Sequence, residues 1–131
     1  EHMVKLAQQL RTPSGSLVKD NDYYRQRFAE MFAEIEIFRY HSLKILSQLM
    51  NNQSPGPEAS IQKLYWSEMH VRMGELAMEF MGEKAPYWGR ESIGRGEMQD
   101  IYLSSRGETI YAGTSQIQKN IISERVLGMP R

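Results

Sequence analysis

The stretch FAEMFAEIEIFRYHSLKILSQL, residues 28–49, decides the fold class. Apolar side chains recur along it in steps of three and four residues, the spacing that places them on one face of an α-helix. The series runs through Phe28, Met31, Ile35, Phe38, Ser42, Ile45 and Leu49. A seam kept up over about three heptads is typical of helices that pack at about 20° in a bundle. We therefore predict a long α-helix with Asp20 or Asp22 as its N-cap and Asn51-Asn52 at its end.

The rest of the chain also divides into helices and breaks, without the alternation that is typical of strands. We predict helices over residues 1–10, 57–82, 97–110 and 115–127, with Pro57 first and Gly82 last in the second of these. The breaks are an exposed loop at 12–16, a long irregular loop at 83–97 and a short turn at 112–114. The pattern predicts an all-α protein, an up-and-down four-helix bundle forming a single domain over residues 1–131. No cap precedes the first helix, so we expect it to be truncated and the chain to be a piece of a longer protein.

Composition excludes several classes of function. Sixteen basic residues balance sixteen acidic ones, so no net charge favours nucleic acid or anionic lipid. The absence of cysteine excludes disulfides and thiolate chemistry and suits a reducing compartment, so we expect a cytoplasmic protein. No apolar run reaches the length of a membrane span, and no signal peptide is recognisable. A di-iron site would need Glu-x-x-His pairs, but Phe38 precedes His41 and Ser67 precedes His70, so we expect no metal.

The segment YAGTSQIQ, residues 111–118, is the strongest candidate for a binding site. Ser115 followed by Gln118 has the spacing of a capping box, which fixes a helix start. Gly113 lets the backbone approach a ligand closely, because glycine has no Cβ. Free N–H groups and the hydroxyls of Thr114 and Ser115 then suit a phosphate or pyrophosphate. Most capping boxes only hold a helix in place, so the residues alone leave both readings open.

Three stretches resemble the acyl-CoA dehydrogenase family. YAGTSQIQKNIISERVLGMPR, residues 111–131, is similar to the family's C-terminal signature, in forms such as YGGTSEIQRNIIAERVLGLPR. NDYYRQRFAEMFAEIEIFR, residues 21–39, resembles the helix that opens the last bundle of the family. PEASIQKLYW, residues 57–66, resembles the next helix, where P-E-A-S-x-x-K-L recurs. The resemblance spans residues 20–131 and implies a helical domain packed against two further domains.

The resemblance implies a flavoenzyme. Family members remove hydrogens from Cα and Cβ of an acyl-CoA thioester, with a glutamate as base and FAD as hydride acceptor. Thr114 and Gln116 would contact the ribose and pyrophosphate of FAD, and Gly113 would allow the close approach. The expected partners are the acyl-CoA substrate and the other domains and subunits of the same enzyme, as a homo-oligomer. The chain alone would be inactive.

Three departures from the family pattern affect the expected chemistry. Ala112 stands where some members carry the catalytic glutamate, so we assign no catalytic residue. The base lies on an earlier helix, or the parent never had one; Glu108, four residues before Ala112, is a substitute base or a solvated side chain. Lys19-Asp20-Asn21-Asp22 and residues 79–85 replace two other flavin-contacting segments, and Glu79 would repel a pyrophosphate. A non-catalytic subunit that pairs with an active dehydrogenase subunit is therefore the alternative.

The aromatic and methionine side chains and the apolar surface give three further expectations. Tyr87 and Trp88 in the long loop pack within the domain or against another domain or subunit. Met31, Met69 and Met73 lie on the core stripes, so we expect them to serve packing. The bundle should expose apolar surface that its neighbours cover in the parent, and we predict self-association.

Overall fold

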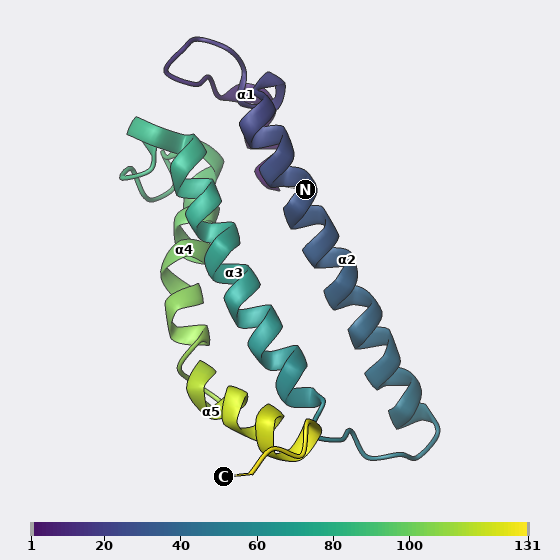
Figure 1. Ribbon diagram of the computed structural model, residues 1–131. Coiled ribbons are helices and arrows are strands. Elements are labelled where there is room, and N and C mark those ends of the chain that lie inside the picture. The colour runs from purple at the N-terminus through teal and green to yellow at the C-terminus, as the bar shows by residue number, and fades with distance from the viewer. Residues whose placement is uncertain (1, 131) are drawn as a thin grey trace.

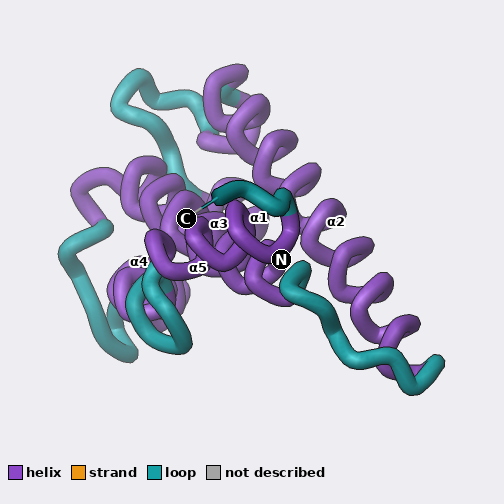
Figure 2. The backbone as a smooth tube through the Cα atoms, turned by 60° about the horizontal axis from the view of Figure 1, so that its bottom comes forward, coloured by secondary structure: helices purple, strands orange, loops and turns teal. Residues whose placement is uncertain are grey.

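The computed structural model describes residues 2–130, and these are helical with connecting loops (Figures 1 and 2). The α-helices are α1 His2–Gln9, α2 Asp22–Met50, α3 Ala59–Met81, α4 Glu97–Glu108 and α5 Ser115–Ile121. Short 3-10 helices lie at Val18–Asp20, Gly82–Lys84 and Ile93–Gly96, and a π-helical turn, Ile122–Val126, follows α5. Within residues 2–130 the extended structure is a single isolated bridge between Arg11 and Leu17. The predicted all-α fold class is confirmed.

Helices α2, α3 and α4 run alternately down, up and down in Figure 1, as an up-and-down bundle requires. Helix α3 is the central element: α2 lies on one side of it, α4 on the other, and α5 crosses below its start. Helix α1 covers the upper end. This places the start of α3 beside the connection between α4 and α5, although the two are far apart in sequence.

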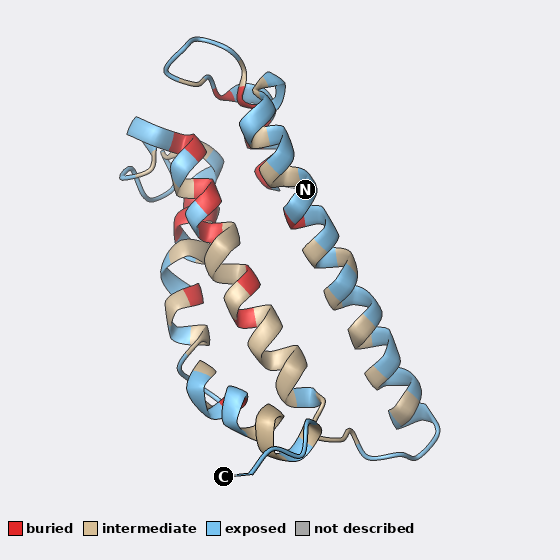
Figure 3. Cartoon of the chain, in the orientation of Figure 1, coloured by how far each residue is buried: buried red, intermediate tan, exposed pale blue. Residues whose placement is uncertain are grey.

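The core lies at the upper end of the bundle, where α1, α3 and α4 meet (Figure 3). Its buried apolar residues are Met3, Leu6, Ala7, Leu10, Val18, Leu76, Ala77, Phe80, Met81 and Met98. Helix α3 approaches α4 closely at Gly74, where a Cβ would lie 2.7 Å from the Cα of Tyr102. Of the three predicted core methionines, Met31 and Met69 are buried and Met73 is half-buried.

Helix α2 is as long as predicted, but its apolar seam is covered less than expected. Met31 is its one buried residue, whereas Ile35 and Leu49 on the same seam are 40% and 50% exposed. Polar contacts also hold it to α3: Arg72 Nη2 donates to Glu34 Oε1 at 2.7 Å, and Gln62 Nε2 donates to Ser42 Oγ at 2.8 Å. Helix α2 makes most of its contacts with α3 and with the Val18–Asp20 turn, so part of its seam has no covering helix among residues 2–130.

Several predicted helix ends are wrong by one to six residues. The N-cap of α2 is Asn21, whose side chain accepts from Tyr24 N at 3.3 Å, because Asp20 belongs to the preceding 3-10 turn and Asp22 is already helical. Pro57 lies in a turn before α3, which begins at Ala59. The ends at Asn51 and Gly82 are confirmed. Helix α4 ends at Glu108, two residues early, and the α-helical part of α5 ends at Ile121, six residues early.

The loops are placed as expected. Residues 12–16 form an exposed turn, closed by a hydrogen bond from Thr12 N to Ser16 O at 2.9 Å. In the long loop Tyr87 and Trp88 are 69% and 63% exposed, so they do not pack inside this domain as core residues. Trp88 still donates from Nε1 to Asp100 Oδ1 at 3.1 Å, which holds the loop against α4.

Candidate functional site

The connection between α4 and α5, residues 109–114, carries the predicted binding residues Gly113 and Thr114 and has a left-handed backbone at two positions, whereas Gln116 lies in the first turn of α5. Ala112 has a φ of +52° and Gly113 a φ of +95°. Left-handed geometry costs an alanine roughly 1–2 kcal/mol and a glycine very little. The turn thus bends sharply at two successive residues, and this sets the direction in which α5 starts.

Thr114, and not Ser115, caps α5. The Thr114 side chain accepts from Ile117 N at 3.3 Å, whereas Ser115 is the first helical residue and its N–H donates to Thr109 O at 3.1 Å. The predicted capping box of Ser115 and Gln118 is therefore wrong by one residue. A threonine and a serine stand side by side, and either hydroxyl can cap a helix, so the local pattern did not distinguish them.

Gln118 holds the turn from inside. It is buried, and its Nε2 donates to the carbonyl of Ala112 at 2.9 Å. A Cβ on residue 113 would lie 2.6 Å from this same nitrogen. Gly113 is therefore required by its positive φ and by the packing of Gln118, independently of any ligand.

Lys63, near the start of α3, reaches the same turn. Its Nζ donates to the carbonyl of Gly113 at 2.7 Å, across 50 positions of sequence. Lys63 is half-buried and has no ion-pair partner among the described residues. The sequence analysis missed it as a site residue. Its position among the apolar residues Ile61, Leu64 and Tyr65 was the available signal, because a lysine on a packed stripe needs a polar partner.

Backbone donors on the turn remain available. Among residues 2–130, no protein acceptor is paired with the N–H of Thr114 or of Gln116. The side chain of Gln116 is exposed and that of Thr114 is half-buried. Donors of this kind, with a lysine ammonium nearby and no carboxylate on the turn itself, fit a phosphate or pyrophosphate.

Glu108 is not available as a free base. Its Oε2 lies 2.9 Å from Nδ1 of His70 on α3, and its side chain is only 13% exposed. The His70 ring in turn packs against Trp66, with ring centroids 4.9 Å apart. The expectation of a solvated side chain is therefore wrong, because Glu108 links the end of α4 to α3.

The turn at residues 79–85 has a different character. Glu79 is exposed and accepts a hydrogen bond from the Tyr23 hydroxyl at 3.4 Å. This bond to the carboxylate raises the pKa of Tyr23 above its ordinary value. A carboxylate at this position opposes a pyrophosphate, so the residues of this turn do not fit that part of FAD.

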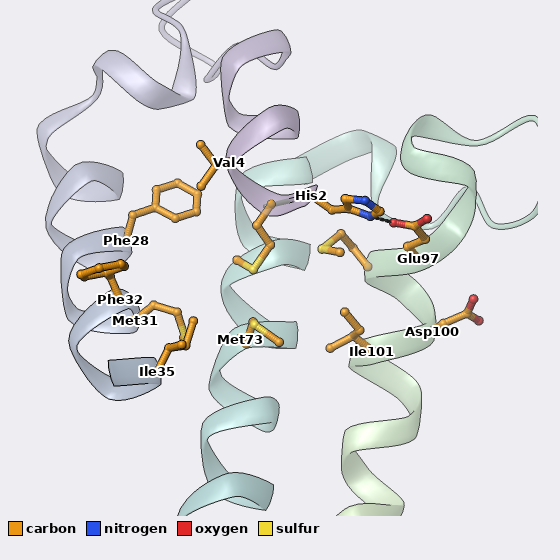
Figure 4. A pocket seen from close by; sticks show the side chains of 12 residues that line it. His2, Val4, Phe28, Met31, Phe32, Ile35, Met73, Glu97, Asp100 and Ile101 are labelled. Carbon is orange, nitrogen blue, oxygen red and sulfur yellow. Dashed lines mark hydrogen bonds and ion pairs between the residues drawn. The ribbon is translucent and has the colours of Figure 1, made fainter. Parts of the chain in front are cut away.

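A groove of about 620 Å³ lies elsewhere, between the upper halves of α2, α3 and α4 and the start of α1 (Figure 4). Apolar side chains from all four helices point into it, among them Phe28, Met31 and Met73. At its rim His2 contacts Glu97. Of the predicted α2 seam, only the upper residues Phe28, Met31 and Ile35 line this groove.

Comparison with known proteins identifies the family. The family model described as "Acyl-CoA dehydrogenase, C-terminal domain" matches residues 1–127. The chain belongs to the acyl-CoA dehydrogenase family. The family resemblance inferred from the sequence is therefore confirmed, and the site at Gly113–Gln116 lies in the domain that the family description names.

Two curated acyl-CoA dehydrogenases are similar in sequence. Acyl-CoA dehydrogenase IpdE1 of Mycolicibacterium smegmatis is 36% identical over 112 residues, covering 86% of this chain and 27% of the relative. IpdE1 of Mycobacterium tuberculosis is also 36% identical, over 86% of this chain and 28% of its own length. The chain thus spans less than a third of these relatives.

Solved structures share the fold of this dehydrogenase domain. A chain of the ChsE4-ChsE5 complex from Mycobacterium tuberculosis superposes with a TM-score of 0.87 at 23% identity, over 99% of this chain and 34% of that one. A chain of a structure titled "Tcur3481-Tcur3483 steroid ACAD" gives 0.84 at 19% identity, over 98% and 33%. At these identities the likeness concerns the fold alone.

Within residues 2–130 of this family member, no helix combines the length and the apolar character of a membrane span. Its described side chains also contain no group of three or more histidine, aspartate or glutamate residues arranged to hold a metal ion.

Proposed function

We propose that this chain is the FAD-contacting and subunit-interface domain of an acyl-CoA dehydrogenase that acts on an acyl-CoA thioester. The observation that carries the proposal is the Gly113–Gln116 turn, which has unpaired N–H groups where the family signature lies. The chain spans less than a third of its curated relatives, so we propose further that it is one domain of a longer protein.

The roles of the turn residues follow from their geometry. The N–H groups of Thr114 and Gln116 donate to the ribose-pyrophosphate region of FAD, and the exposed amide of Gln116 adds a further donor. Gly113 permits the positive φ of the turn, and its missing Cβ leaves room for the buried Gln118 side chain that holds the turn. When bound, FAD supplies the hydride acceptor for α,β-dehydrogenation. The domain itself supplies orientation and donors.

The chain offers no base for this reaction at the turn. The methyl group of Ala112 carries no exchangeable proton, and the carboxylate of Glu108 is engaged by His70. A proton at Cα of the thioester therefore has no acceptor here. We propose that the chain alone does not turn over acyl-CoA, and that FAD contact is confined to the turn.

Flavin binding to the purified chain tests the proposal. Quenching of FAD fluorescence is expected to saturate. Gln116→Ala removes the side-chain amide donor and is expected to weaken binding by about tenfold, the size of one hydrogen bond to a charged group. Thr114→Ala removes the cap that holds the N–H groups in place and is expected to weaken binding as well. Thr114→Ser keeps the cap and serves as the control for helix fraying. Ser104→Ala, on the exposed side of α4, should bind as the parent chain does. Equal binding by every variant would contradict the assigned contacts.

A second candidate is a domain of a non-catalytic subunit that pairs with an active acyl-CoA dehydrogenase subunit. Ala112 at the position of the base and Glu79 at the second flavin turn favour it. The two similar structures are also named for pairs of proteins, the ChsE4-ChsE5 complex and Tcur3481-Tcur3483.

Subunit composition separates the two candidates. Native mass spectrometry of the full-length parent would give one kind of chain, each with a flavin, if the parent is a self-sufficient homo-oligomer. A complex of two different kinds of chain, with fewer bound flavins than chains, would support the non-catalytic subunit instead.

A further inference from the structure

We propose that Lys63 is a positioning residue that orients the Gly113–Thr114 peptide so that its N–H faces the ligand. The bond from Lys63 Nζ to Gly113 O is 2.7 Å, at the short end of the range for charge-assisted N–H···O bonds. Among residues 2–130 no other group donates to this carbonyl. The ligand part of the inference rests on the proposed function, whereas the orientation of the peptide does not.

The geometry of a peptide bond carries the argument from the carbonyl to the donor. A trans peptide is planar, and its C=O and N–H point in opposite directions. Because Lys63 on α3 holds the carbonyl of Gly113, the N–H of Thr114 points away from α3. That is the N–H for which the described protein offers no acceptor. The lysine thus determines where an unpaired donor is presented.

Glycine makes such a constraint necessary. Gly113 has a φ of +95°, and a residue without Cβ can rotate between several backbone conformations at little cost. Two neighbouring hydrogen bonds hold other carbonyls of the turn: Gln118 Nε2 donates to Ala112 O, and Ser115 N donates to Thr109 O. Thr114 itself is held by Ile117 N on its hydroxyl and by Gln118 N on its carbonyl, so Lys63 is the group that holds the remaining carbonyl, that of Gly113.

The charge of Lys63 adds a second effect. No salt bridge neutralises it among the described residues, whereas Lys119, which also lies on this side of the bundle, is paired with Glu68 at 3.7 Å. An uncompensated ammonium that is half-buried beside the turn favours an anionic group there. The orientation of the Gly113–Thr114 peptide and the charge of Lys63 therefore both favour a phosphate-bearing ligand.

Amide hydrogen exchange on the 131-residue chain tests the orientation without any ligand. In Lys63→Met the amides of Ser115, Ile117 and Gln118, which are bonded within the turn, are expected to exchange about tenfold faster. Amides in the middle of α3 and α4 should not change. Lys63→Arg, which keeps the charge and the donors, should restore protection, and Lys44→Met on the exposed face of α2 is the matched control.

A second measurement uses the unaltered chain, in case Lys63→Met does not fold. The Lys63 ammonium protons should exchange with water more slowly than those of the exposed Lys44, because they are hydrogen-bonded. The proposal would be overturned if the two ammonium groups exchanged at equal rates. It would also be overturned if a folded Lys63→Met left the exchange rates of the turn amides unchanged, or raised the exchange rates of all amides in the chain equally.

Flavin titration then separates this inference from the proposed function. FAD binding should weaken about tenfold in Lys63→Met and recover in Lys63→Arg. If the unaltered chain binds no FAD while the turn amides still depend on Lys63, the proposed FAD contact fails and the positioning role stands. If FAD binds equally well to Lys63→Met, the positioning role for the ligand is wrong and the flavin site stands.

Discussion

At the scale of single residues, the turn between α4 and α5 is held by groups that short sequence patterns do not connect. The helix start near residues 113–115 was located from the sequence because capping and glycine signals are local. Lys63 was not, because its acceptor is 50 residues away. The register of the cap was wrong by one residue because Thr114 and Ser115 have the same capping chemistry.

Ala112 should be a site of backbone strain. Its φ of +52° costs an alanine roughly 1–2 kcal/mol, and the extra flexibility of glycine in the unfolded chain offsets part of this. Ala112→Gly is therefore expected to raise the free energy of unfolding by about 0.5–1 kcal/mol in urea denaturation. Ala29→Gly, inside α2, should lower it by about 1 kcal/mol. A loss of stability in Ala112→Gly would show that the left-handed turn is not strained.

Tyr23 should report the charge of Glu79. Its pKa is raised chiefly by the hydrogen bond to the Glu79 carboxylate, which favours the protonated phenol. Glu79→Gln removes the charge and keeps the length of the side chain, so the pKa of Tyr23 should fall toward its ordinary value. Titration of the tyrosine Cζ signals by NMR measures this directly, with the exposed Tyr40 as the internal control. An unchanged Tyr23 would mean that the contact is absent in solution.

At the scale of helices, apolar periodicity predicted where each helix lies but not what covers it. All five α-helices fall in the predicted segments, with ends displaced because neighbouring residues have similar turn and capping propensities. The seam of α2 was read correctly as one face. Its partial exposure was not predictable, because a periodic pattern identifies an apolar face without identifying its neighbour.

The contact between α3 and α4 should depend on Gly74. A Cβ there would lie 2.7 Å from the Cα of Tyr102, a backbone atom that moves only if the helices separate. Gly74→Ala is expected to lower the free energy of unfolding by roughly 1–3 kcal/mol, despite the better helix propensity of alanine. Gly107→Ala is the matched control on α4: no atom lies within 4 Å of its Cβ position, so stability should rise by up to about 1 kcal/mol. Equal effects of the two substitutions would refute the close approach.

At the scale of the whole molecule, helix α2 exposes large apolar side chains along its length, and such a surface favours contact with another protein surface. The exposed residues are Phe32, Ile35, Ile37, Tyr40, Leu43, Leu46, Leu49 and Met50. In the proposed parent, other domains and subunits cover this surface. The self-association predicted from the sequence is therefore expected to occur through the exposed surface of α2.

Sedimentation velocity should show association of the chain that increases with concentration. Leu43→Glu combined with Leu46→Glu is expected to weaken it by more than about tenfold, since each buried leucine contributes at least roughly 1.5 kcal/mol. Gln26→Glu, on the exposed upper part of α2, adds charge without removing apolar surface and should not affect it. A chain that stays monomeric at high concentration would contradict the prediction.

The central claim is that the Gly113–Gln116 turn binds the pyrophosphate region of FAD, and NMR titration of the labelled chain tests it most directly. On addition of FAD, the backbone amide signals of Thr114 and Gln116 should shift saturably, and riboflavin, which has no phosphate, should leave them in place. Saturable shifts confined to another part of the chain, such as the groove lined by Phe28 and Met73, would contradict the claim. The same holds if both ligands shift the two amides equally.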